Sequence, residues 1–293
     1  MSYDFEKMAD ELEAAGDYRV LRHVPQWPGP QPSTWGEYED IKAAIFLDVE
    51  TTGLNPKTDK VIELVMMPFA YGAMSGVITD IGEPYHAYND PGIAIPPKIT
   101  KLTGITDEMV KGKSFDVKAI DTFASGFRFC IAHHAKFDRP FVETISPVFT
   151  GLHWACSMEQ VPWDEFEITG RKLDYIAFRL GWFYEAHKAQ NDCHAALSIL
   201  ARTIPGRDTT FMHALLSEAR KPNYRVWATG SPIGEKDKLK DRGYRWEPAR
   251  KTWHTEVGKD EVDAELAWLA TNAKTPGAEA VPISPLNRFT DRV

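Results

Sequence analysis

The 293-residue sequence has few cysteines, no long apolar run and no positive net charge. Cys130, Cys156 and Cys193 are odd in number and lack CxxC spacing, which argues for a reducing compartment and against a disulfide framework or zinc module. The longest apolar stretch, 64–74, is broken by a proline and a glycine and is too short to span a bilayer. Residues 1–6 lack the basic and apolar regions of a secretory signal. We therefore expect a cytoplasmic protein with no membrane partner.

The net charge of −8 excludes a surface that attracts polyanions throughout. The charge is unevenly distributed, however. Residues 221–258 carry nine basic and five acidic side chains, a surplus of +4 that leaves −12 for the rest of the sequence. Any electrostatic contact with a nucleic acid is therefore expected in this segment.

Proline-rich and aperiodic segments divide the sequence into four parts. The first contains a predicted acidic helix over 3–15 and a linker over 25–32. Strand signals at 43–48, 61–71 and 77–87, followed by strands alternating with helices, predict an α/β domain whose mixed central sheet has helices on both faces. The four predicted parts are an N-terminal helix and linker (1–40), a large α/β domain (41–220), a small basic, aromatic-rich α+β module (221–272) and a flexible tail (273–293).

Two acidic residues close the first apolar strand of the large domain. Asp48 and Glu50 follow the apolar run 43–47, and because side chains alternate along a strand they point to the same face. Two adjacent carboxylates repel each other unless a cation lies between them, and Mg²⁺ or Mn²⁺ suits oxygen ligands. The alternative is that both acids are solvated at the end of the strand.

Two further acids and a histidine lie at the ends of other elements. Asp138 follows the strand predicted over 128–132 and lies at the start of a helix. Asp192 lies in the first turn of a later helix, predicted to begin near residue 191. His187 precedes Asp192 in a loop. Each acid alone is typical of a helix cap or a solvated first-turn charge. Four acids and one histidine at element ends of one domain favour a common site.

Three motifs in this order resemble the DEDDh 3′–5′ exonucleases, the group of polymerase proofreading subunits, RNase T and oligoribonuclease. They are Asp-Val-Glu-Thr-Thr-Gly at 48–53, Ala-His-His-Ala-Lys-Phe-Asp at 132–138 and His-Lys-Ala-Gln-Asn-Asp at 187–192. The resemblance covers about 43–203. His134 stands where the family usually has Asn, which would alter how the second motif's loop is held.

The resemblance implies an RNase H-like exonuclease fold over 41–220, which would be the catalytic domain. A pair of divalent cations about 4 Å apart can bind the attacking and leaving oxygens of a phosphodiester. Two ions, Mg²⁺ or Mn²⁺, would thus be held by Asp48, Glu50, Asp138 and Asp192, with His187 as general base. By the same resemblance, the 3′-terminal nucleotide would be held by Thr51, Thr52, Gly53 and Leu54, with Phe137 packed under the site.

The expected function is a metal-dependent 3′–5′ exonuclease that releases nucleoside 5′-monophosphates from single-stranded 3′ ends, with DNA favoured. This activity suits DNA repair and proofreading, and a polymerase or repair complex would be its partner; a homodimer is compatible with the sequence. Two alternatives remain open. One is an exoribonuclease of the RNase T or oligoribonuclease type. The other is a non-catalytic nucleic-acid-binding or polymerase-partner protein on the same fold, against which the intact set of five residues argues.

The module over 221–272 interleaves aromatic and basic residues, a composition typical of single-strand stacking surfaces. The candidate nucleic-acid contacts are Arg245, Trp246, Arg250 and Trp253. The alternative is that the aromatic residues form the core of a small domain. Docking against another protein is also consistent with the spacing.

Overall fold

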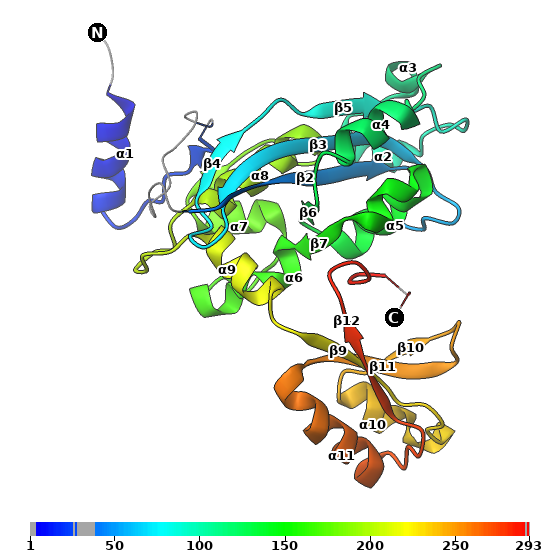
Figure 1. The fold of residues 1–293 in the computed structure, drawn as a ribbon. Coiled ribbons are helices and arrows are strands. Elements are labelled where there is room, and N and C mark those ends of the chain that lie inside the picture. The colour runs from blue at the N-terminus through cyan, green and yellow to red at the C-terminus, as the bar shows by residue number, and fades with distance from the viewer. Residues whose placement is uncertain (1–3, 26, 28–38, 291, 293) are drawn as a thin grey trace. The chain divides into compact units, whose positions relative to one another are not determined.

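The computed structural model describes residues 4–25, 27, 39–290 and 292, and the predicted linker over 25–32 lies largely outside them. The chain separates into two compact units, Met1–Glu218 and Ala219–Val293. The first unit combines the N-terminal segment with the large domain, and the second contains the small module together with the predicted tail (Figure 1).

A mixed six-stranded sheet forms the centre of the first unit. The strand order is β4-β3-β2-β6-β7, and β5 pairs with the same edge of β3 as β4 does, at the opposite end. The pairs β2/β3, β3/β4 and β3/β5 are antiparallel, whereas β2/β6 and β6/β7 are parallel. The strands are β2 (Ile41–Thr51), β3 (Val61–Gly72), β4 (Ile78–Ile81), β5 (Tyr85–Tyr88), β6 (Phe129–Ala132) and β7 (His153–Cys156).

Helices flank this sheet, as predicted. Helix α8 (Ala189–Ala201) packs against β2 and β3, and α5 (Ala135–Ile145) packs against β2, β6 and β7. Because both faces are covered, residues 44–47 of β2 form a continuous buried run rather than alternating with polar residues. The other helices of this unit are α2 (Pro97–Thr103), α3 (Asp107–Val110), α4 (Val117–Ala124), α6 (Ser157–Gln160), α7 (Leu173–Arg179) and α9 (Phe211–Ala219), with 3₁₀ turns at Pro147–Gly151 and Trp163–Phe166.

The single strand predicted over 77–87 is instead two strands, β4 and β5. Residues 82–84 between them belong to neither strand: the N–H of Gly82 still donates to the carbonyl of Pro68 in β3, but Pro84 has no N–H to donate. The interruption lets β5 continue alongside the half of β3 that lies next to the acidic end of β2.

The N-terminal segment packs onto the large domain. Helix α1 (Phe5–Ala14) confirms the helix predicted there, and strand β1 (Arg22–His23) pairs in parallel with β8 (Trp182–Phe183). The guanidinium of Arg19 donates to the carbonyl oxygens of Phe178 and Arg179 at the end of α7. Residues before the large domain therefore support the segment that leads into α8.

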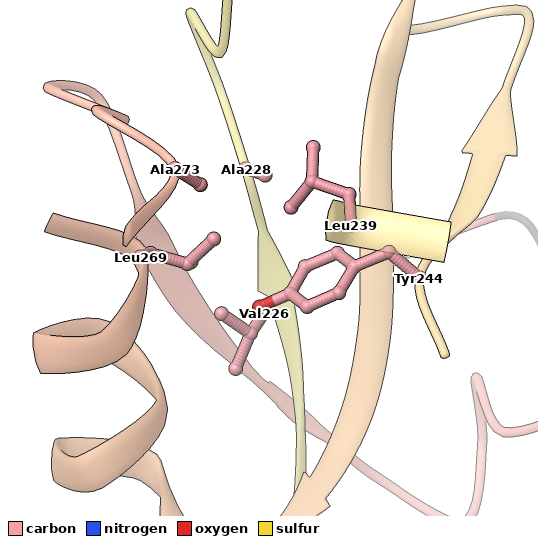
Figure 2. Packing of buried hydrophobic residues seen from close by; sticks show 6 residues of the cluster. All are labelled: Val226, Ala228, Leu239, Tyr244, Leu269 and Ala273. Carbon is pink, nitrogen blue, oxygen red and sulfur yellow. The ribbon is translucent and has the colours of Figure 1, made fainter. Parts of the chain in front are cut away.

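The second unit is an antiparallel sheet, in the order β10-β11-β9-β12, with two helices. Its core consists of Val226, Ala228, Leu239, Tyr244, Leu269 and Ala273, and Figure 2 shows these side chains converging from β9, α10, α11 and the segments that follow them. The elements are β9 (Asn223–Trp227), α10 (Lys236–Asp241), β10 (Arg245–Glu247), β11 (Thr252–Gly258), α11 (Val262–Asn272) and β12 (Glu279–Ile283), with 3₁₀ turns at Ile233–Glu235 and Lys259–Glu261.

The prediction of a flexible tail over 273–293 is wrong for much of this segment. Residues 279–283 form β12, which pairs with β9 along its whole length and buries Ile283. Beyond the strand, Arg288 is buried and donates to the carbonyl of Ala219. A five-residue strand containing a proline gives too weak a periodicity to be recognised from the sequence.

In the part of the chain that the structure describes, no helix is both long enough and apolar enough to cross a membrane.

Candidate active site

Three predicted acids meet at the end of β2. Asp48 and Glu50 project from the same face of that strand, and Asp192 lies in the first turn of α8, which packs against β2. Each of the three offers a carboxylate oxygen, and these oxygens all lie within 4.8 Å of one another. Such a group of oxygen ligands suits a hard divalent cation.

Asp138 reaches the same place from a different helix. Strand β6 runs parallel to β2 and ends beside Leu47, so α5, which starts three residues later, carries Asp138 in its first turn. The side chain is only 2% exposed, and its Oδ2 has no hydrogen-bond partner among the described residues. A buried carboxylate oxygen without a partner is costly unless something positive binds it. The four residues therefore fit a divalent metal site.

The electrostatics of the four acids support this interpretation. Burial first, and then the charges of Asp192, Glu63 and Asp138, raise the pKa of Glu50 to about 8. Burial also raises the pKa of Asp138 to about 8, against the backbone N–H of Val49. The pKa of Asp48 is raised by its burial and by the charge of Asp138. Because these carboxylates are buried close to one another, they resist ionisation. A cation between them would allow all of them to be charged.

Glu63 is a fifth acid at the site that the sequence did not point to. It lies directly opposite Glu50 in the β2/β3 ladder, is 4% exposed and contacts His86 Nε2 at 2.7 Å through Oε1. Its charge contributes to the raised pKa of Glu50, after burial and Asp192. In the sequence Glu63 interrupts an apolar strand, and only the register of β2 and β3 brings it to the site.

His187 lies in the loop between β8 and α8, exposed and with a left-handed backbone (φ 64°). The Glu185 carboxylate pairs with Lys188 at 2.7 Å, and the Glu185 carbonyl accepts from the Asn191 side chain, which ties the loop to the start of α8. Burial raises the pKa of Asp192, whereas the hydrogen bond from Tyr184 and the charge of His187 oppose the increase. The base candidate and the acid thus interact.

Tyr184 is a second residue that the sequence reasoning missed. Its hydroxyl donates to Asp192 Oδ1 at 2.7 Å. Tyrosine occurs throughout the chain, and no spacing rule distinguishes this one.

The loop after β2 borders an open cavity of about 690 Å³. Thr51 and Thr52 are buried: the Thr51 hydroxyl donates to the Gly53 carbonyl, and Thr52 Oγ1 accepts from the Lys60 N–H. Leu54, by contrast, is 83% exposed. The cavity is lined by Thr52, Gly53, Leu54, Asn55, Asp59, Pro96, Lys98, Ile99 and Leu102, so three of the four predicted nucleotide-holding residues border it.

The second motif is held by aromatic packing and buried polar contacts. Phe137 is partly buried and packs on Phe141, with a ring separation of 5.0 Å. His134, which replaces the family's Asn, stacks on Phe137 at 5.8 Å and makes no side-chain cap for α5. His133 is buried between the Ser157 hydroxyl and the Arg171 carbonyl, and burial lowers its pKa to about 4. His133 is therefore a neutral structural link.

The family model described as Exonuclease matches residues 45–200, more than half of the chain. The chain belongs to the exonuclease family. The matched span contains all five residues of the predicted catalytic set and confirms the DEDD-type resemblance.

Curated relatives of this exonuclease carry the name DNA polymerase III PolC-type. The chain is 31% identical to the Clostridium perfringens protein over 162 residues, 53% of this chain and 11% of the relative. It is 37% identical to the Listeria monocytogenes protein over 108 residues, 36% of this chain and 7% of the relative. The exonuclease thus spans about a tenth of the length of these relatives.

Two solved structures are also similar to the exonuclease. One is Exonuclease X in complex with 5′ overhanging duplex DNA, at 18% identity and a TM-score of 0.44, covering 60% of this chain and 99% of that one. The other is Escherichia coli Exonuclease I in complex with a dA16 oligonucleotide, at 15% identity and a TM-score of 0.49, covering 74% of this chain and 63% of that one.

The four candidate nucleic-acid contacts of the second unit do not share one surface. The β10/β11 register pairs Trp246 with Trp253, and their rings meet edge to face at 5.6 Å on the side where Trp253 packs against the core. Arg245 directly precedes Trp246 in β10, so its side chain points to the opposite face of the sheet. On that face Arg250 lies over the Trp227 ring at 4.3 Å. Trp246 is 48% exposed, whereas Trp253 is partly buried.

Proposed function

We propose that this exonuclease is a metal-dependent enzyme that removes nucleotides from the 3′ end of single-stranded nucleic acid, DNA favoured, and releases nucleoside 5′-monophosphates. The observation that carries the proposal is the group of carboxylate oxygens that β2 and α8 bring within 4.8 Å of one another, beside the buried Asp138 of α5, whose charge acts on Asp48. A structural role does not require this arrangement, because each acid alone would be solvated at lower cost.

The residues that would hold two divalent ions, Mg²⁺ or Mn²⁺, are Asp48, Glu50, Asp138 and Asp192. The unpartnered Oδ2 of Asp138 and the raised pKa values of these carboxyls, caused first by burial, support this ligand set. When bound, the ions would stabilise negative charge on the attacking and leaving oxygens of the phosphodiester.

His187 would accept the proton of the attacking water. Its loop is exposed and adjoins the first turn of α8, so the imidazole can approach a substrate bound at the acids. An imidazole suits this task because its neutral form is a base near neutral pH.

The cavity beside the β2 loop would take the 3′-terminal nucleotide. Leu54, Ile99 and Leu102 offer apolar surface for a base, and Lys98 offers a positive charge for a phosphate. The backbone of Thr51, Thr52 and Gly53 would hold the sugar end, while Phe137 packs under the site. The cavity adjoins the strand end that carries Asp48 and Glu50, as an exonuclease subsite requires.

The second unit would contact the strand upstream of the 3′ end. Arg245 and Arg250 are exposed on one face and form no ion pair among the described residues, so they are available for phosphates, whereas the exposed Trp246 on the other face offers a ring for a base. Trp253 packs against the core, so we assign it mainly a structural role rather than a contact with the strand. The name of the relatives, DNA polymerase III PolC-type, supports a proofreading or repair role with a polymerase partner.

The test is digestion of matched 5′-labelled DNA and RNA oligonucleotides, single-stranded, with Mg²⁺ or Mn²⁺. The expected result is a ladder that shortens from the 3′ end, release of 5′-mononucleotides, faster turnover of DNA, and no products from Asp48→Ala. Faster digestion of RNA would support the exoribonuclease alternative. Binding of both strands without cleavage by the unaltered protein would contradict the proposal and support the non-catalytic one.

A further inference from the structure

Tyr184 connects the general-base loop to the acidic cluster. It is partly buried, and its hydroxyl donates to Asp192 Oδ1 at 2.7 Å. Asp192 Oδ1 is a carboxylate oxygen that can accept this hydrogen bond, and a phenol hydroxyl is the donor. Among the described residues, no side-chain hydrogen bond reaches the other three carboxylates of the set.

The backbone that carries Tyr184 is fixed from outside the motif. Strand β8 ends one residue before it, and the β8 partner is β1 in the N-terminal segment. The N–H of Val24 donates to the carbonyl of Phe183 at 2.9 Å, directly before Tyr184. The phenol is therefore held by a paired strand rather than by the loop it precedes.

We propose that Tyr184 is a positioning residue: its hydrogen bond to Oδ1 holds Asp192 in one orientation and leaves the second carboxylate oxygen directed at a divalent metal. Asp192 already brings an oxygen within 4.8 Å of oxygens of Asp48 and Glu50. Hydrogen bonds to a ligating carboxylate orient it before the ion binds, and their loss weakens metal binding. The inference rests on the proposed metal-dependent function and assigns a residue outside its three motifs.

The test is Tyr184→Phe, which removes the hydroxyl and keeps the ring. We expect the dissociation constant for Mn²⁺, measured by calorimetry without substrate, to rise about 10- to 100-fold. The Mn²⁺ concentration for half-maximal hydrolysis should rise in parallel. At saturating Mn²⁺ the kcat should approach that of the unaltered protein, because all four carboxylates and His187 remain, and KM for a short oligonucleotide should not change.

Tyr175→Phe is the matched control. Tyr175 also lies in the first unit, and its hydroxyl accepts from Arg179 rather than donating to a carboxylate. Its removal should leave Mn²⁺ affinity unchanged. Melting of both variants without metal shows whether either substitution disturbs the fold, and circular dichroism of Tyr184→Phe should match that of the unaltered protein.

Three results would overturn the inference in distinguishable ways. If the unaltered protein binds Mn²⁺ and Tyr184→Phe binds it equally well, Tyr184 does not position Asp192 and the proposed function stands. If kcat stays low at saturating Mn²⁺ while affinity is unchanged, Tyr184 acts in another way. If the unaltered protein binds no Mn²⁺ and hydrolyses no oligonucleotide, the proposed function fails, and the inference fails with it.

Discussion

Asp138→Asn should make the metal-free protein more stable while it abolishes hydrolysis. Burial raises the pKa of Asp138 from 3.8 to about 8, with backbone N–H groups opposing and the charge of Asp192 adding. Near pH 7 the folded protein must therefore take up a proton that the unfolded chain does not carry. At about 1.4 kcal/mol per pKa unit, this costs up to about 4 kcal/mol. An amide carries no charge and avoids the cost.

The pH dependence gives the sign of the effect. Because the pKa of Asp138 is higher in the folded protein, its contribution to stability is fully present below the unfolded value. It is lost as the pH rises to about 8. The melting temperature of the unaltered protein without metal should thus fall between about pH 4 and pH 8. Asp138→Asn should flatten this fall and raise the melting temperature near pH 7 by about 5–15 °C.

Metal should remove most of this difference in stability. Mn²⁺ at a hundred times its dissociation constant stabilises a protein that binds it by about 2.7 kcal/mol, and the variant has lost a ligand charge. The assay is differential scanning calorimetry of both proteins, with chelator and with Mn²⁺. The exposed Asp80 of β4 supplies the control Asp80→Asn, which should change neither curve. The reasoning is refuted if, in chelator, the melting temperature of Asp138→Asn is equal to or lower than that of the unaltered protein and changes with pH in the same way.

Three other predictions concern the base and the second unit. His187→Ala should lower the hydrolysis rate by about 10²- to 10⁴-fold with unchanged Mn²⁺ affinity, and equal rates would move the base role elsewhere. Arg245→Ala combined with Arg250→Ala should reduce the salt slope for binding long single strands by about 1.4 and leave dinucleotide hydrolysis unchanged; an unaltered slope would remove the proposed contact. Trp253→Ala should lower the melting temperature, because the ring packs on the core, whereas Trp246→Ala should instead weaken strand binding; the reverse pattern would contradict this assignment.

The large elements of the first unit could be predicted because their signals are local. The apolar run before Asp48 predicted β2, and the ends of α2 coincide with local signals, Pro97 at its start and a left-handed Gly104 after its last residue. The acids could be grouped because each follows or begins an element, and parallel strands bring such ends together. Asp138 shows this directly, since β6 pairs with β2 just before the site.

What could not be predicted depends on register and on distant pairing. Glu63 belongs to the site only because the β2/β3 register places it opposite Glu50. Tyr184 reaches Asp192 through a loop whose conformation includes a left-handed His187. The split of the four hairpin residues between two faces follows from the pairing of Trp246 with Trp253, and composition does not reveal pairing.

Because β1 pairs with β8, the family match and the hydrogen bonds place the start of this domain at different residues. By homology, the exonuclease begins at residue 45. By hydrogen bonding it begins earlier, since the N–H groups of Arg22 and Val24 occupy the carbonyls of Gly181 and Phe183. A gene fragment cut at residue 45 would encode every side chain of the proposed site and still leave those two carbonyls without their donors. The edge so exposed lies one residue before Tyr184, so such a fragment should lose order first where the loop that carries His187 begins.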